Sequence, residues 1–171
     1  MSPECTAGPS REQQWSCRLD GDAYAVVTAR ALATAVLVGW DADLVEDVVL
    51  VTSELVTNAI AHGAAPVVYA LTVRKGDEPA IVVDVTDASA DLPVQHLPGE
   101  VGHFGLWIAE ELARVTVHPN PPGKTVRATF DVINASLLPS PCKRPIRCPC
   151  RGGTLAVQDD MALGAWDAYR G

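Results

Sequence analysis

The chain contains 171 residues, of which 48% are hydrophobic and 20% are charged, and this composition excludes wholesale disorder. Thirteen Lys and Arg residues against 21 Asp and Glu residues give a formal net charge of −8. That charge argues against direct nucleic-acid binding, because phosphates are met by a basic face. The apolar runs are far shorter than the roughly 20 residues that a membrane-spanning helix needs, and the N-terminus lacks the apolar stretch of a secretory signal. We therefore expect a cytoplasmic protein that contacts no membrane.

Three regions follow from the residue types along the chain. Residues 1–13 are predicted to be a disordered leader, 14–132 a folded domain, and 133–171 a largely unstructured tail containing Pro, Cys and Arg. Within the domain, strands and helices segregate as in an α+β layer pair. The predicted elements are a strand over 14–19, helices over 22–38 and from Asp41 to Gly63, strands over 66–73 and 80–85, a loop over 87–101, a helix over 104–114, and strands over 115–118 and 125–132.

The helix between Asp41 and Gly63 is the best-signalled element. Asp41 is a good N-cap residue, Gly63 stands where a glycine commonly ends a helix, and apolar residues recur every three or four positions between them. Glu54, Asn58 and His62 interrupt this pattern at i, i+4 and i+8. Polar groups on a buried face cost about 1–3 kcal/mol each if unsatisfied, so these residues either form a site or serve only as an edge Glu, a capping Asn and a His at the helix dipole.

Further polar and glycine positions lie later in the chain. Asp84 and Asp87 come at the end of an apolar strand, and Gly99, Gly102 and Gly105 lead into a helix, as phosphate-binding segments do. These glycines lack the strand-first context and spacing of a dinucleotide fingerprint. The run from Gly123 to Thr125 is not a P-loop either, because the upstream glycine is missing and a strand follows.

Four segments in this order resemble the GHKL ATPases, the superfamily of gyrase, heat-shock chaperone, histidine kinase and mismatch-repair ATPases. Ser53-Glu-Leu-Val-Thr-Asn-Ala-Ile-Ala-His-Gly63 is similar to their N box, and Val83-Asp-Val-Thr-Asp87 to the segment whose aspartate recognises adenine. Gly102-His-Phe-Gly-Leu106 resembles the glycine box beside the ATP lid, and Gly123-Lys-Thr-Val126 the closing strand. The compact size and the N-box spelling most resemble RsbW-like anti-sigma serine kinases. The resemblance implies a two-layer α+β sandwich with a mixed β-sheet and helices on one face.

The resemblance also implies roles for single residues. Asn58 would supply an amide oxygen to Mg²⁺, and Glu54 would act as the general base. Asp87 would accept a hydrogen bond from the adenine amino group of ATP. The remaining expected nucleotide contacts are His62, which either reaches phosphate or caps its helix, the glycine-box residues Gly102, His103, Phe104, Gly105 and Leu106, and Thr125, whose hydroxyl would support the adenine pocket.

Two functions remain open at this point. The first is a serine kinase that passes the ATP γ-phosphoryl group to a serine of an anti-sigma antagonist of the STAS type, with a sigma factor as its other partner. The second is a non-catalytic protein in which ATP orders the lid and so sets the affinity for a partner. The resemblance further implies a homodimer. Glu54 discriminates the two functions, because transfer needs it and nucleotide binding does not.

Overall fold

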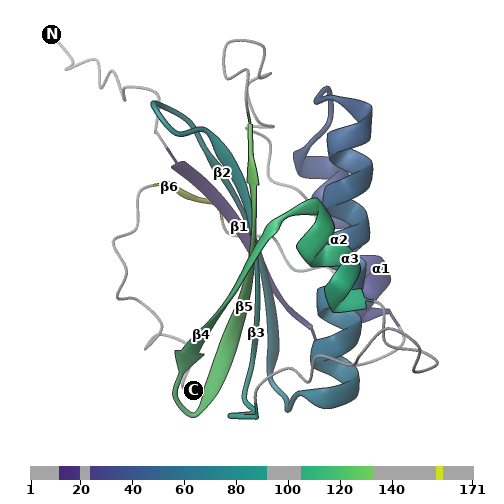
Figure 1. Cartoon of the computed structure of the whole chain (residues 1–171), viewed down its shortest axis with the longest axis vertical. Coiled ribbons are helices and arrows are strands. Elements are labelled where there is room, and N and C mark those ends of the chain that lie inside the picture. Colours follow the sequence, from purple (N-terminus) through teal and green to yellow (C-terminus); the bar gives the residue numbers. More distant parts are fainter. Residues whose placement is uncertain (1–11, 20–23, 92–104, 133–156, 160–171) are drawn as a thin grey trace, which may run out of the picture.

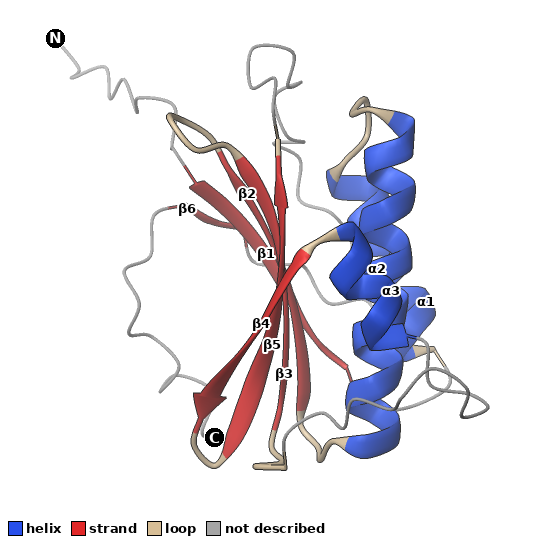
Figure 2. Cartoon of the chain, in the orientation of Figure 1, coloured by secondary structure: helices blue, strands red, loops and turns tan. Residues whose placement is uncertain are grey.

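The computed structural model describes residues 12–19, 24–91, 105–132 and 157–159. Among these residues, six strands form one sheet, and three helices cover one face of it (Figures 1 and 2). Across the sheet the strands lie in the order β4-β5-β3-β2-β1-β6. The elements are β1 Glu12–Leu19, α1 Ala25–Val36, α2 Ala42–His62, β2 Val67–Arg74, β3 Ala80–Asp87, α3 Gly105–Leu112, β4 Arg114–Asn120, β5 Gly123–Asp131 and β6 Val157–Asp159.

The predicted two-layer α+β class is confirmed, but the sheet is antiparallel rather than mixed. All five strand pairings run antiparallel. The reason lies in the connection from β3 through α3 to β4. This crossover makes β4 run in the same direction as β3, but the hairpin return β5 inserts between them. No two neighbouring strands are therefore parallel.

The core lies between the sheet and the helices and follows the alternation of side chains along the strands. Trp15, Tyr69 and Leu71 are fully buried on the helix-facing side of β1 and β2, as are Ile81 and Val83 on β3. From the helices, the buried residues are Ala29, Leu32, Ala33 and Val36 of α1, and Val48, Val51, Leu55, Val56 and Ala59 of α2. The stripe predicted for α2 is thus the face that covers the sheet.

Helix α2 begins and ends at the residues that the sequence predicted. The Asp41 side chain accepts a hydrogen bond from the Leu44 backbone N–H at 3.1 Å, which confirms the predicted N-cap. Gly63 does end the helix, but with φ −91° and ψ −166°, an extended backbone that any residue can adopt. Backbone conformation therefore does not explain the glycine, and the reason lies in the atoms packed around it.

The ends of the predicted domain also differ from expectation. Strand β1 begins at Glu12, so two residues assigned to the leader belong to the sheet. In the predicted tail, Val157–Asp159 forms β6, which pairs with Gln13–Trp15 of β1. β1 is consequently not an edge strand. No helix within the described residues has the length and apolarity needed to cross a membrane.

Two leucines on α2 test this placement of the core. Leu55 is 3% exposed and Leu50 is 39% exposed. We expect Leu55→Ala to lower the free energy of unfolding by about 2–5 kcal/mol, because it removes buried methyl groups and leaves a cavity. The matched change Leu50→Ala should cost no more than about 0.5 kcal/mol. Urea denaturation measures both, and equal losses would contradict the assigned helix face.

Candidate functional site

Asp87 lies where the end of β3 meets the end of α2. The residue is only 3% exposed, and its side chain lies on the helix-facing side of the sheet. A Cβ atom at Gly63 would lie 2.7 Å from the Asp87 carboxyl carbon and would also overlap the Ala59 carbonyl. The Ala88 N–H donates to the Ala64 carbonyl at 2.8 Å and ties the two chain segments together. Glycine is thus needed at position 63 because the Asp87 carboxylate packs against the helix end.

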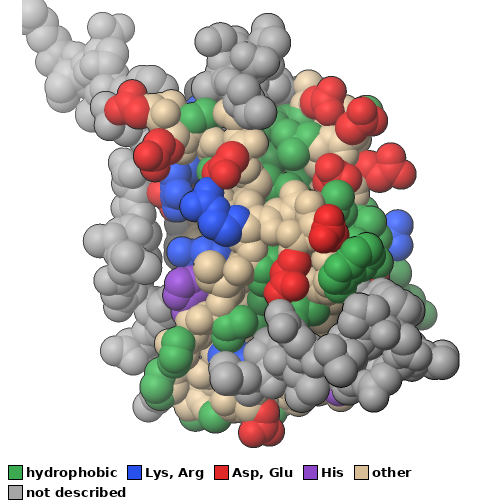
Figure 3. Space-filling view, in the orientation of Figure 1, with side chains coloured by type: hydrophobic (Ala, Val, Ile, Leu, Met, Phe, Trp, Pro, Cys, Tyr) green, Lys and Arg blue, Asp and Glu red, His purple; other side chains and the backbone are tan. Residues whose placement is uncertain are grey.

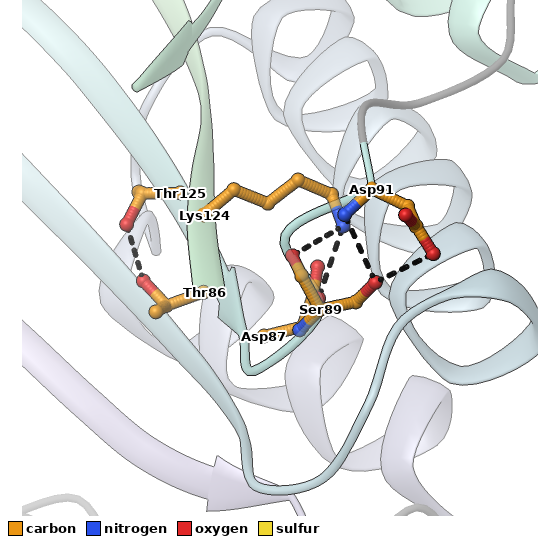
Figure 4. A network of polar contacts seen from close by, with 6 residues as sticks. All are labelled: Thr86, Asp87, Ser89, Asp91, Lys124 and Thr125. Atoms are coloured by element: carbon orange, nitrogen blue, oxygen red, sulfur yellow. Dashed lines mark hydrogen bonds and ion pairs between the residues drawn. The ribbon is translucent and has the colours of Figure 1, made fainter. Parts of the chain in front are cut away.

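Lys124, the second residue of β5, is the closest charged partner of Asp87 (Figure 4). Its Nζ lies 3.0 Å from Asp87 Oδ1 and 3.2 Å from the Ser89 carbonyl oxygen. The two charged side chains are 8% and 2% exposed. The Ser89 N–H donates to the same carboxylate oxygen at 2.8 Å. A buried ammonium therefore binds the carboxylate and also the first turn of the chain after β3.

Gly123 permits this close approach of β5 to β3. A Cβ at this position would collide with the Asp87 backbone oxygen and lie 2.6 Å from the Ala88 Cα. Because both obstacles are backbone atoms, neither can turn aside as the end of a side chain can. The glycine and the lysine after it therefore form one structural unit with Asp87.

Thr125, predicted to support the base pocket, lies on the other face of the sheet. The register pairs Asp87 with Lys124 and Thr86 with Thr125, and the two threonine hydroxyls are 2.8 Å apart. On that outer face Arg127 forms a two-point ion pair with Asp84, at 2.7 and 2.9 Å, and this hydrogen bonding raises the Arg127 pKa. The position beside the Asp87 carboxylate thus belongs to Lys124, which sequence reasoning passed over.

The signal for Lys124 was present in the alternation of β5. Val126, Ala128 and Phe130 are apolar and buried, and Lys124 shares their parity. A lysine at that parity faces the helices, where a charged group needs a partner. Comparison with a P-loop considers Lys124 as a phosphate ligand, whereas the structure shows it as the buried partner of the Asp87 carboxylate.

Glu54, Asn58 and His62 lie on α2 as their spacing predicted. Glu54 and Asn58 are partly buried, and His62 is exposed at the last residue of the helix. Within the described part of the chain, neither Glu54 nor Asn58 has a side-chain hydrogen-bond partner. No group of three or more His, Cys, Asp or Glu side chains among the described residues is arranged to hold a metal ion.

The N-terminus of α3 lies against Glu54. Gly105 is its first residue, and a Cβ there would collide with Glu54 Oε2 and lie 3.1 Å from the carboxyl carbon. The first N–H groups of a helix have no partner within the helix and carry partial positive charge. Leu106 packs against the core. Gly102, His103 and Phe104, also predicted to contact the nucleotide, lie outside the described residues.

These contacts define two ends of one site along α2. Asp87 and Lys124 lie at the Gly63 end, and the start of α3 lies beside Glu54. Gly63 lies nine positions after Glu54, which at a rise of about 1.5 Å per residue spans about 13–14 Å. In Figure 3, acidic side chains lie both over the helices and at the upper left over the sheet, and most of the basic side chains in view lie over the sheet.

Comparisons with known proteins relate the chain to a family and to a solved structure. The family model described as "Histidine kinase-like ATPase domain" matches residues 20–130, which is more than half of the chain. Among solved structures, the chain resembles the crystal structure of the RsbU and RsbW domains of Rv1364c from Mycobacterium tuberculosis, with 26% sequence identity and a TM-score of 0.52. The likeness covers 68% of this chain and 32% of that one, so the chain spans about a third of its structural relative. No curated protein sequence matches the chain.

The glycines around the site give a test of its packing. We expect Gly123→Ala to lower the free energy of unfolding by about 1–3 kcal/mol, because the new methyl group meets backbone atoms of Asp87 and Ala88. Gly105→Ala should cost less than about 1 kcal/mol, because it meets the flexible end of Glu54 and alanine favours a helix. Chemical denaturation compares the two variants. A larger loss for Gly105→Ala would contradict the contacts described.

Proposed function

Because the chain belongs to the histidine kinase-like ATPase domain family, we propose that it binds Mg·ATP between α2, the end of β3 and the start of α3. The proposal extends to an anti-sigma-type regulator in the cytoplasm that acts as a serine protein kinase. The observation that carries it is the polar line along α2. A buried carboxylate stands at one end, and Glu54 with a helix N-terminus stands at the other.

The residues present fit a nucleoside triphosphate. Asp87 is the acceptor for the amino group of adenine, as its burial and position beside a glycine suggest. The span of about 13–14 Å from Gly63 to Glu54, taken from the rise of a helix, suits the length of ATP from the amino group of adenine through the ribose to the γ-phosphate. Asn58 lies between the two ends and offers an amide oxygen of the kind that Mg²⁺ accepts. Bound Mg²⁺ would neutralise phosphate charge and leave most of its coordination to phosphates and water.

The chemistry at the other end is positioning and electrostatic stabilisation. Glu54 accepts the proton of a serine hydroxyl whose oxygen attacks the γ-phosphorus, as the bond to the bridging oxygen breaks. The N–H groups at the start of α3, next to this carboxylate, stabilise negative charge on the phosphate. The absence of a hydrogen-bond partner for Glu54 among the described residues leaves it able to serve as this base.

The likeness to a structure with an RsbW domain supports the choice of partners. We propose a serine of an anti-sigma antagonist of the STAS type as phosphate acceptor and a sigma factor as the second partner, with a homodimer as the working unit. A second candidate function is nucleotide-gated partner binding without transfer. The contact of Gly105 with Glu54 is compatible with both, since it also lets the nucleotide site communicate with α3.

Binding is tested by isothermal calorimetry with Mg·ATP. We expect Asp87→Asn to weaken binding at least about tenfold, because the change removes the charged acceptor and also leaves the buried Lys124 ammonium, without its carboxylate, beside the amino group of adenine. The matched control is Asp84→Asn on the opposite face of the same strand, where the carboxylate pairs with Arg127. This change should leave ATP affinity unaltered. Equal effects of the two variants, or no binding by the wild type, would refute the assigned pocket.

Transfer is tested with labelled ATP and a STAS-type antagonist protein. We expect Glu54→Ala to bind ATP like the wild type but to lower the transfer rate by about 10²–10⁴-fold, the usual contribution of a general base. Glu46→Ala, an exposed glutamate on the same helix, is the control and should transfer normally. A wild type that binds ATP and transfers nothing would favour the nucleotide-gated function instead.

A further inference from the structure

Asp87, the carboxylate proposed to bind adenine, already accepts hydrogen bonds from groups of the chain itself. Asp87 Oδ1 accepts from both Lys124 Nζ and the Ser89 N–H, at 3.0 and 2.8 Å. Among the described residues, Oδ2 has no hydrogen-bond partner. An amino group of a ligand would therefore donate to a carboxylate whose negative charge is already compensated by the buried ammonium of Lys124.

This arrangement changes what a ligand gains on binding. A buried carboxylate without a charged partner obtains its main stabilisation when the ligand arrives, so the ligand's amino group contributes strongly. Here the Lys124 ammonium supplies that stabilisation beforehand. It also places a positive donor beside the partly positive amino group of the ligand, which is unfavourable. The amino group then contributes less to affinity, and a ligand without it loses less.

We propose that Lys124 is a specificity-determining residue of the base pocket, which stands in for the exocyclic amino group of adenine when the site is empty. It lowers the affinity for ATP and narrows the preference for 6-amino over 6-oxo purine nucleotides. This inference rests on the proposed function, since it concerns the same carboxylate. An opposite role, in which Lys124 donates to a ring nitrogen of the bound base, predicts the opposite sign in the same measurement.

The experiment is calorimetric titration with ATP and with inosine triphosphate, which carries a 6-oxo group in place of the amino group. The proteins are the wild type, Lys124→Thr, Lys124→Met and the control Lys75→Thr, in the turn at the other end of β3. We expect the wild type to prefer ATP by less than about tenfold. Both Lys124 variants should bind ATP at least about tenfold more tightly, the size of one charge-assisted hydrogen bond, while inosine triphosphate gains little. Lys75→Thr should match the wild type.

Several outcomes overturn the inference. Weaker ATP binding by the Lys124 variants, or an unchanged ratio of the two affinities, would assign Lys124 to another role while leaving ATP binding intact. An effect of Lys124→Thr that Lys124→Met does not share would make space, not charge, the cause. Absence of any nucleotide binding in the wild type and in all variants would refute the proposed function and this inference together.

Loss of the lysine also leaves Asp87 buried without its cation, so a variant can be unstable without ligand. Thermal unfolding with increasing ATP covers this case, because a ligand that binds only the folded state raises its melting temperature. We expect a lower melting temperature without nucleotide and a larger rise with ATP in the Lys124 variants than in the wild type. If no variant folds, the ratio of the wild-type affinities for ATP and inosine triphosphate decides the question alone. A preference for ATP above about a hundredfold would overturn the proposal, because an amino group that donates to a charge-compensated carboxylate contributes less than this to the affinity.

Discussion

The pairing of Lys124 with Asp87 is the interaction on which the rest of the site depends. An uncompensated buried carboxylate costs several kcal/mol, so a side chain that is 2% exposed needs its cation close by. The lysine reaches it only because Gly123 lets β5 start against the backbone of Asp87. The same ammonium binds the Ser89 carbonyl and so fixes the chain as it leaves β3. One ion pair thus determines where the sheet ends and where the loop beyond it begins.

Helix α2 connects this pair to the other half of the site. One side of the helix is fixed to the sheet by buried residues such as Val51 and Leu55, so the remaining side has a defined orientation. Glu54 and Asn58 take their positions from that packing rather than from hydrogen bonds among the described residues. A rigid backbone with unpartnered polar side chains is what a binding site for a polar ligand requires, because the positions are set before the ligand arrives.

The parts that could be predicted are those that local patterns determine. The Asp41 cap, the apolar face of α2 and the strands β2 and β3 depend on residue patterns within a few positions of the chain, and each is found in the structure. Lys124 was missed because its partner is 37 positions away and is fixed only by the register of β5 on β3. Thr125 was expected to support the adenine pocket, but the register of β5 on β3 puts it on the face opposite Asp87, since a shift of one residue reverses every side chain of a strand. The pairing of Val157–Asp159 with β1 is also a contact between distant segments that no local pattern announces.

The two ends of the site have different physical tasks, and this separation bears on the choice between kinase and nucleotide-gated regulator. In the proposed function, charge compensation by Lys124 at the Asp87 end affects how strongly adenine is held, and the phosphate reacts at the other end. At the Glu54 end, the carboxylate lies against Gly105, so the group proposed as base also contacts the first turn of α3. A ligand that draws the flexible end of Glu54 aside removes a side chain against which that turn packs. In the proposed function, transfer and gating therefore share one contact.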